Sequence, residues 1–151
     1  MKKIFSVEKT SGTIDIALLV ARLGIAFLML THGIPKLMML LSGGQVQFPG
    51  MLGMSPEFSL SLAVFAEVFC SALILTGFAT RLATLPLIAT MLTAVLLVHA
   101  SDPFAVKESG LNYLVVYIVL LFAGSGKFSV DYLVSQNRKH HPTGELAYSK
   151  R

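Results

Sequence analysis

The chain has 151 residues, of which 54% are hydrophobic and only 13% are charged. About a quarter of the residues in an ordinary soluble domain are charged, and a single domain of this length could not bury so much apolar surface. The composition therefore excludes a soluble globular protein and predicts an integral membrane protein. Most of the Lys and Arg behind the net charge of +4 lie at the chain ends and in short turns, which indicates lipid headgroups rather than nucleic acid as the partner.

Residues 1–12 are polar and basic, and we expect them to form a short cytoplasmic lead. The first predicted membrane span follows at about residues 14–36. Roughly 20 apolar residues at a rise of 1.5 Å each are enough to cross the ~30 Å hydrocarbon core. The apolar run is too long for a cleaved signal peptide and is interrupted by Arg22, so we expect it to be retained.

The segment 42–56 contains glycine and proline but no Lys or Arg, which predicts a loop and leaves open whether it enters the membrane. Further spans are expected at about 57–78, 82–99 and 111–128, and a second polar loop is expected at 101–110. Residues 134–151 read as a polar, disordered cytoplasmic tail. The prediction is an all-α four-helix transmembrane bundle over 13–133, since the alternation of a β-barrel is absent.

The basic residues predict the orientation of this bundle. If both chain ends are cytoplasmic, nine of the twelve Lys and Arg residues fall on the cytoplasmic side. Such a bias is the positive-inside rule, and it predicts an N-in, C-in topology. The nine residues are Lys2, Lys3, Lys9, Arg81, Lys127, Arg138, Lys139, Lys150 and Arg151.

Two charged residues lie inside the predicted spans. Arg22 is about nine residues into the first span and Glu67 is ten residues into the second, so counting places both near the middle of the membrane. An unpaired charge at that depth costs on the order of 3 kcal/mol, which predicts that Arg22 and Glu67 form an ion pair. The pair either fixes the register of the helices or serves a proton, quinone or substrate site.

A second polar cluster is predicted at the outer ends of the spans. His32 and Lys36 are four residues apart and share a helix face. The topology brings further polar residues to the same rim, where they either bind a quinone headgroup or another ligand or anchor the helices at the interface. Two histidines from different helices do not make a metal site, and we expect none. The remaining members of this rim cluster are His99, Asp102, Lys107, Glu108, Asn112 and Tyr113, of which we take His99, Asp102, Glu108 and Tyr113 as ligand candidates together with His32 and Lys36.

The chain has one cysteine, Cys70, which excludes an internal disulfide and a CxxC redox pair. Any redox chemistry therefore requires a bound cofactor or a partner protein.

The ordered set of polar positions resembles the DoxX family of small bacterial inner-membrane proteins. The segments that carry the resemblance are RLGIAFLMLTHGIPKL, AVFAEVFCSALILTGFATRLA and HASDPFAVKESGLNYLVVYIVLLFAGSGKFSVD, and together they extend over roughly residues 14–133. The resemblance implies a four-helix protein of the inner membrane. The family-type positions are Arg22, His32, Gly33, Lys36, Glu67, Arg81, His99, Asp102, Pro103, Glu108, Tyr113, Gly124, Gly126, Lys127 and Asp131.

The resemblance also implies a role in redox metabolism, because family relatives include a subunit of a thiosulfate:quinone oxidoreductase and a membrane partner in an oxidoreductase complex. It assigns no catalytic residue. The leading hypothesis is an accessory or anchoring subunit of a membrane redox complex that binds quinone. The alternatives are a quinone-linked oxidoreductase subunit of the thiosulfate:quinone type, and a pathway for small solutes or protons. Expected partners are the bilayer, a soluble or membrane oxidoreductase and a second copy of the chain.

Overall fold

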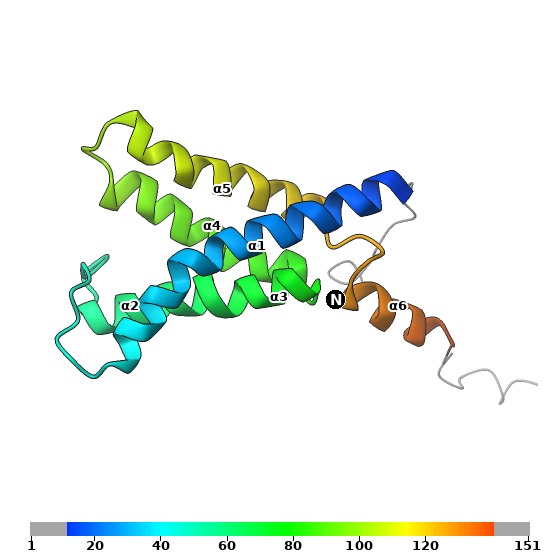
Figure 1. Ribbon diagram of the computed structural model, residues 1–151, viewed down its shortest axis with the longest axis horizontal. Coiled ribbons are helices and arrows are strands. Elements are labelled where there is room, and N and C mark those ends of the chain that lie inside the picture. Colours follow the sequence, from blue (N-terminus) through cyan, green and yellow to red (C-terminus); the bar gives the residue numbers. More distant parts are fainter. Residues whose placement is uncertain (1–11, 141–151) are drawn as a thin grey trace, which may run out of the picture.

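The computed structural model describes residues 12–140, and all regular structure in that range is helical. Four rods run back and forth, and a short sixth α-helix follows them (Figure 1). The second and third rods each contain a π-helical segment, η1 and η2. The elements are α1 (Gly12–Leu41), α2 (Pro56–Val64), η1 (Phe65–Cys70), α3 (Ser71–Thr76), α4 (Thr80–Thr93), η2 (Ala94–Val98), α5 (Phe104–Ala123) and α6 (Val130–His140).

All four rods are long and apolar enough to cross a membrane. This finding confirms the all-α prediction with four membrane-spanning helices. Helix α1 packs against the rod α2–η1–α3, and α4 packs against α5 and η1. Large apolar side chains are exposed on all four rods, for example Phe27, Phe69, Leu96 and Phe122, as expected for surfaces that face lipid tails.

The two ends of the bundle differ in their connections. We call one the loop end, because it carries the segments 42–55 and 99–103; it lies to the left in Figure 1. The other is the turn end, which carries Gly12, the tight turn at 77–79 and the connection 124–129; it lies to the right in the figure.

Three helix boundaries differ from those predicted, among them the end of α5, which lies at Ala123 rather than near residue 128. Helix α1 continues past Lys36 to Leu41, and α5 begins at Phe104, so the predicted loop at 101–110 is wrong for most of its length. Pro103 precedes the first helical residue, where its missing N–H is not needed. The polar residues that suggested a loop occupy the first turns of α5, at the end of the rod.

The predicted disordered tail is also wrong for residues 134–140, which belong to α6. Ser129 begins this helix, because its hydroxyl accepts a hydrogen bond of 3.2 Å from the N–H of Tyr132. The rest of the predicted tail, 141–151, and residues 1–11 of the predicted lead lie outside the described residues.

Polar contacts fasten the turn end. The guanidinium of Arg22, which is fully buried, donates a hydrogen bond to the carbonyl of Phe128 and interacts electrostatically with Asp131. Asp15, buried in the first turn of α1, accepts a hydrogen bond of 3.1 Å from the backbone N–H of Lys127 and forms an ion pair with the ammonium of the same residue, also at 3.1 Å. The first helix is thereby joined to the segment that follows α5.

Asp131 also joins α6 to the turn between the second and third rods. Its carboxylate accepts hydrogen bonds from the N–H groups of Ala79 (2.8 Å) and Thr80 (3.3 Å), and so caps the N-terminus of α4. Gly77, in the same turn, adopts a φ of +71°, and a Cβ at this position would collide with the guanidinium of Arg22. Both the left-handed backbone and the closeness of Arg22 therefore require glycine here.

Candidate functional site

The predicted Arg22–Glu67 ion pair is wrong, because each residue has another partner. Glu67 pairs with Lys36, whereas Arg22 lies at the turn end against the carbonyl of Phe128. The prediction counted depth from the expected ends of the spans. Because α1 extends to Leu41, the antiparallel second rod meets it in a different register, and Glu67 faces Gly33. Eleven residues separate Gly33 from Arg22 on α1, which is ~16 Å along the helix axis.

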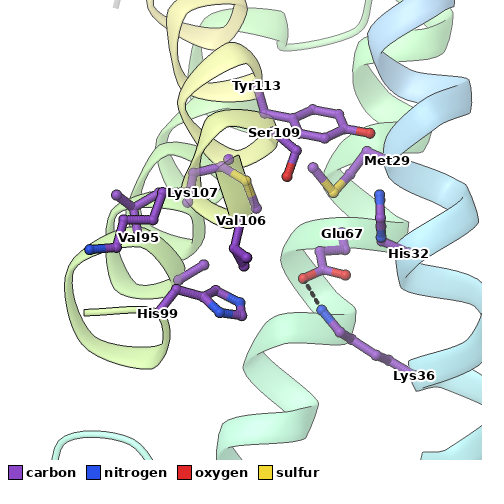
Figure 2. Close-up of a pocket in the computed structure, with 13 residues that line it drawn as sticks. Met29, His32, Lys36, Glu67, Val95, His99, Val106, Lys107, Ser109 and Tyr113 are labelled. Carbon is purple, nitrogen blue, oxygen red and sulfur yellow. Dashed lines mark hydrogen bonds and ion pairs between the residues drawn. The ribbon is translucent and has the colours of Figure 1, made fainter. Parts of the chain in front are cut away.

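The centre of the candidate site is the ion pair between the ammonium of Lys36 and Oε1 of Glu67 (Figure 2). The carboxylate is 2% exposed, and the side chain of Lys36 is 29% exposed. Oε2 of Glu67 is buried and has no hydrogen-bond partner within residues 12–140. An ionisable group inside a membrane span is costly unless it is paired, so a carboxylate with one oxygen left over indicates a site for a ligand or a proton.

The backbone brings the two helices close together at this point. A Cβ on Gly33 would lie 2.8 Å from a methyl carbon of Val68 and 3.0 Å from the carbonyl carbon of Glu67, so only glycine permits this approach. Glu67 belongs to the π-helical segment η1. A π-helical turn holds an extra residue, which shifts the side chains that follow to another face, and such segments often occur at functional sites.

His99 reaches the site from the end of η2. Its backbone N–H donates to the carbonyl of Ala94 at 2.9 Å, which ends the π-helical segment. Nδ1 of its ring lies 2.7 Å from Oδ2 of Asp102, three residues along the chain. Both side chains are well exposed, at 40% and 46%, so this pair lies where water at the loop end reaches it.

His32 and Tyr113 complete the site from α1 and α5. Their rings meet edge to face with centroids 5.9 Å apart, and the ring of Tyr113 stacks on Tyr117 at 6.2 Å. Figure 2 shows His32, His99 and Tyr113 arranged around the space beside the Glu67 carboxylate. Side chains from three rods and from the end of η2 therefore converge on one acidic group.

The space between these side chains is a cavity of about 180 Å³, which we call the polar cavity. Ala94, Met29 and other apolar residues close part of its wall, and its polar side chains supply both donors and acceptors. The polar residues that line it are His32, Lys36, Glu67, His99, Lys107, Ser109 and Tyr113.

A second space of about 600 Å³, which we call the apolar groove, begins at the same ion pair. It runs between the second and third rods, where Leu62, Phe65, Ala89 and Thr93 line it. Leu62 and Phe65 are 45% and 48% exposed, so the groove opens sideways on the surface that faces lipid. The polar cavity and the apolar groove share Lys36, Glu67, Ala94 and His99.

The loop 42–55 covers part of the apolar groove. Phe48, Met51 and Leu52 line the groove from this loop, and the ring of Phe48 lies 5.9 Å from the ammonium of Lys36. The N–H of Met51 donates a hydrogen bond of 3.0 Å to the hydroxyl of Ser59, which holds the loop against α2. Several apolar residues in a loop without Lys or Arg are the sequence signal that could have indicated this role.

The other rim residues lie differently. Asp102 contacts His99 but lines neither space, and Glu108 is exposed and lines neither space. Lys107 turns its ammonium away toward the carbonyl of Ala100, at 2.7 Å (Figure 2). The structure therefore brings together His32, Lys36, His99 and Tyr113 of the predicted rim cluster, and it adds Glu67 and Ser109 to them.

The polar side chains of the site offer both hydrogen-bond donors and acceptors. Within residues 12–140, no group of three or more His, Cys, Asp or Glu side chains is placed to hold a metal ion. The ammonium of Lys36 and the ring N–H groups of the histidines donate, whereas Glu67 accepts. Such a set fits a ligand that carries both carbonyl and hydroxyl oxygens.

Comparison with known proteins supports the family resemblance. The family model described as DoxX matches residues 17–100, which is more than half of the chain. The match includes Arg22, His32, Lys36, Glu67 and His99, and it ends before α5. Searches of the curated proteins and of the solved structures found no match. With four helices that can span a membrane, the chain is a multi-pass membrane protein that belongs to the DoxX family.

Proposed function

We propose that this protein is an accessory subunit of a membrane redox complex and that it binds a quinone at the Lys36–Glu67 pair. In this proposal the protein lies in the inner membrane of a bacterium with both chain ends in the cytoplasm. Arg81 and Lys127 at the turn end then belong to the basic cytoplasmic side. The loop end, with the site, faces the opposite side.

One observation carries the proposal: the apolar groove opens toward lipid and ends on an ion pair whose carboxylate is buried. A quinone has this division of chemistry, since a ring with two carbonyl oxygens is joined to a long apolar tail. The tail fits along Leu62 and Ala89, and the ring reaches Lys36 and Glu67. A ligand that enters from the bilayer needs no aqueous opening on this side.

The polar groups suit both redox states of such a ring. The ammonium of Lys36, and Nε2–H of His99 when its imidazole is protonated, donate hydrogen bonds to the carbonyl oxygens of the oxidised quinone. After reduction by two electrons and two protons, a hydroxyl of the hydroquinone donates to the Glu67 carboxylate instead. The electrons come from a partner oxidoreductase, which the subunit holds at the membrane.

The alternative functions use the same residues in other ways. A quinone-linked oxidoreductase subunit of the thiosulfate:quinone type would use Lys36, Glu67 and the two histidines as catalytic groups. A carrier of small solutes or protons would need a route past the turn end, where Arg22 fills the interior against Phe128. The accessory role requires neither catalytic groups nor a route through the turn end, and so we prefer it.

The test is to extract the protein gently into native lipid discs and to analyse the bound quinone and the attached proteins by mass spectrometry. Ala89→Phe fills the apolar groove, and Leu85→Phe is its matched control, because Leu85 lies on the same helix, is 49% exposed and does not line the groove. We expect bound quinone in the wild type and in Leu85→Phe, and little in Ala89→Phe or Lys36→Met.

Discs that hold no quinone, or an Ala89→Phe variant that holds as much as the wild type, would refute quinone binding in the groove. A soluble oxidoreductase in the same discs supports the accessory role. Reduction of quinone by the purified protein without that partner would establish the catalytic alternative instead.

A further inference from the structure

Glu67 lies between two spaces, because it is part of the wall of both the apolar groove and the polar cavity. Oε1 is held by Lys36, and Oε2 is buried without a hydrogen-bond partner in the described chain. The acidic residue at the end of the groove is therefore also part of the wall of a polar space.

The polar cavity is large enough for water. About 10–15 Å³ of such space is enough for one water molecule, so a cavity of about 180 Å³ holds several. The walls supply the polar partners that such water needs, among them His32, Ser109 and Tyr113. The polar cavity therefore offers both the room and the polar partners for a short chain of water beside Glu67.

His99 lines the cavity and also lies at the exposed loop end. Its Nδ1 lies 2.7 Å from the carboxylate of Asp102, so Nδ1–H is the donor in that contact and Nε2 is left for the cavity. An imidazole held in this way can take up a proton on Nε2 and release it again.

We propose that Glu67 exchanges a proton with the water at the loop end, through the polar cavity, with His99 as the intermediate proton carrier. In the uptake direction, Nε2–H of the His99 imidazolium gives its proton through water to the Glu67 carboxylate. His99 becomes neutral, Glu67 becomes a neutral carboxylic acid, and His99 then takes a new proton from water at the loop end.

Protonation of Glu67 has a consequence for Lys36. The carboxyl group no longer carries the charge that holds the ammonium, so Lys36 becomes available to donate to a ligand in the apolar groove. This consequence rests on the proposed quinone site, whereas the proton exchange itself does not. The titratable and charged groups that face Glu67 are Lys36 and His32 from α1, His99 at the end of η2, and Tyr113 and Tyr117 from α5.

The first measurement is the side from which Glu67 is protonated. Dicyclohexylcarbodiimide is lipid-soluble and reacts with protonated carboxyl groups, and peptide mass spectrometry locates the adduct. The protein is placed in vesicles whose exposed end has been established by labelling of Ser101→Cys, with the pH set separately on the two sides. The Glu67→Gln variant shows which adduct belongs to this residue.

We expect labelling of Glu67 to become about tenfold faster for each unit by which the pH on the loop side falls, as long as the carboxyl is mostly ionised. The pH on the turn side should have no effect. Labelling that follows the turn side, or that ignores the pH of both sides, would overturn the proposal.

The second measurement tests His99. A proton is released by a light pulse in the water at the loop end, and the carboxylic-acid C=O band that Glu67→Gln lacks is followed by time-resolved infrared spectroscopy. His99→Gln keeps a hydrogen-bonding side chain but cannot carry a proton, and it should slow the appearance of the band at least about tenfold. Glu108→Gln is the matched control, because Glu108 is titratable and exposed on α5 near the same end but does not line the cavity.

An unchanged rate in His99→Gln would refute His99 as the carrier, and thermal unfolding of each variant shows that its fold is intact. Neither measurement uses quinone or a partner protein. Failure of quinone to co-purify would therefore remove the proposed function and leave the proton exchange in place. Bound quinone together with labelling of Glu67 that ignores the pH at the loop end would remove the proton exchange and leave the proposed function in place.

Discussion

Lys36 and Glu67 form an ion pair in which the acid is buried and the base is partly in contact with solvent. Removing Lys36 leaves a charge in the interior, whereas removing Glu67 leaves a charge that reaches water. We therefore expect Lys36→Met to reduce the free energy of unfolding by about 1–3 kcal/mol, and Glu67→Gln to reduce it by less. Denaturation in mixed micelles measures both.

The double variant Lys36→Met, Glu67→Gln should cost less than the sum of the two single variants by at least about 1 kcal/mol, because contacting partners are coupled. Additive effects would show that the two side chains contribute independently and would count against the ion pair.

Gly33 and Gly24 both lie on α1 but have different surroundings. A methyl group on Gly33 would meet Val68 at 2.8 Å, whereas nothing lies within 4 Å of the corresponding position on Gly24. Gly33→Ala should destabilise the bundle by about 1–3 kcal/mol, since it pushes α1 away from η1. Gly24→Ala should be neutral or stabilising by up to ~1 kcal/mol. Equal unfolding curves for the two variants would contradict the close contact.

Asp131 caps α4 from the segment that follows α5. Asp131→Ala should lower the free energy of unfolding by about 1–2 kcal/mol, because two N–H groups lose their acceptor. Asp102→Ala is the comparison, because Asp102 is 46% exposed and pairs with its neighbour His99, so its loss should cost less than about 0.5 kcal/mol. A larger loss of unfolding free energy in Asp102→Ala than in Asp131→Ala would contradict the capping role of Asp131.

The orientation of the bundle can be tested with single cysteines in a Cys70→Ser background. Ser101 and Gln136 are both exposed, at the loop end and on α6 respectively. With both chain ends in the cytoplasm, a membrane-impermeant maleimide should label Ser101→Cys in intact cells and Gln136→Cys only after lysis. The opposite pattern would invert the proposed topology.

The sequence predicts the existence of the four spans well, because a long apolar run between polar segments matches the thickness of the bilayer and is too large to bury in so short a soluble chain. It predicts the register poorly. The partner of Glu67 depends on where α1 ends and on how the second rod meets it, and the predicted partner, Arg22, lies 14 residues from Lys36 on α1, which is about four helical turns. Depth in the membrane indicates that each of these charges needs a partner, but it does not identify the partner.

Other parts of the site depend on contacts that no local pattern reports. The π-helical segment around Glu67 has no sequence signature of its own, and the role of Asp131 depends on N–H groups about 50 residues away. His32 and Lys36 were predictable as neighbours because their spacing of four residues fixes a common helix face. Their position beside Tyr113 depends on how α1 packs against α5, which the spacing within one helix does not predict.

The hydrogen bond between Arg22 and the carbonyl of Phe128 joins residues 106 positions apart. At a synthesis rate of about 5–20 residues per second, the ribosome needs about 5–20 s to make the second partner after the first. During that interval the nascent first helix carries an arginine whose acceptor, together with the nearby Asp131, has not yet been made. The order of translation therefore makes closure of the turn end a late step of assembly, completed only after the fourth rod has been synthesised.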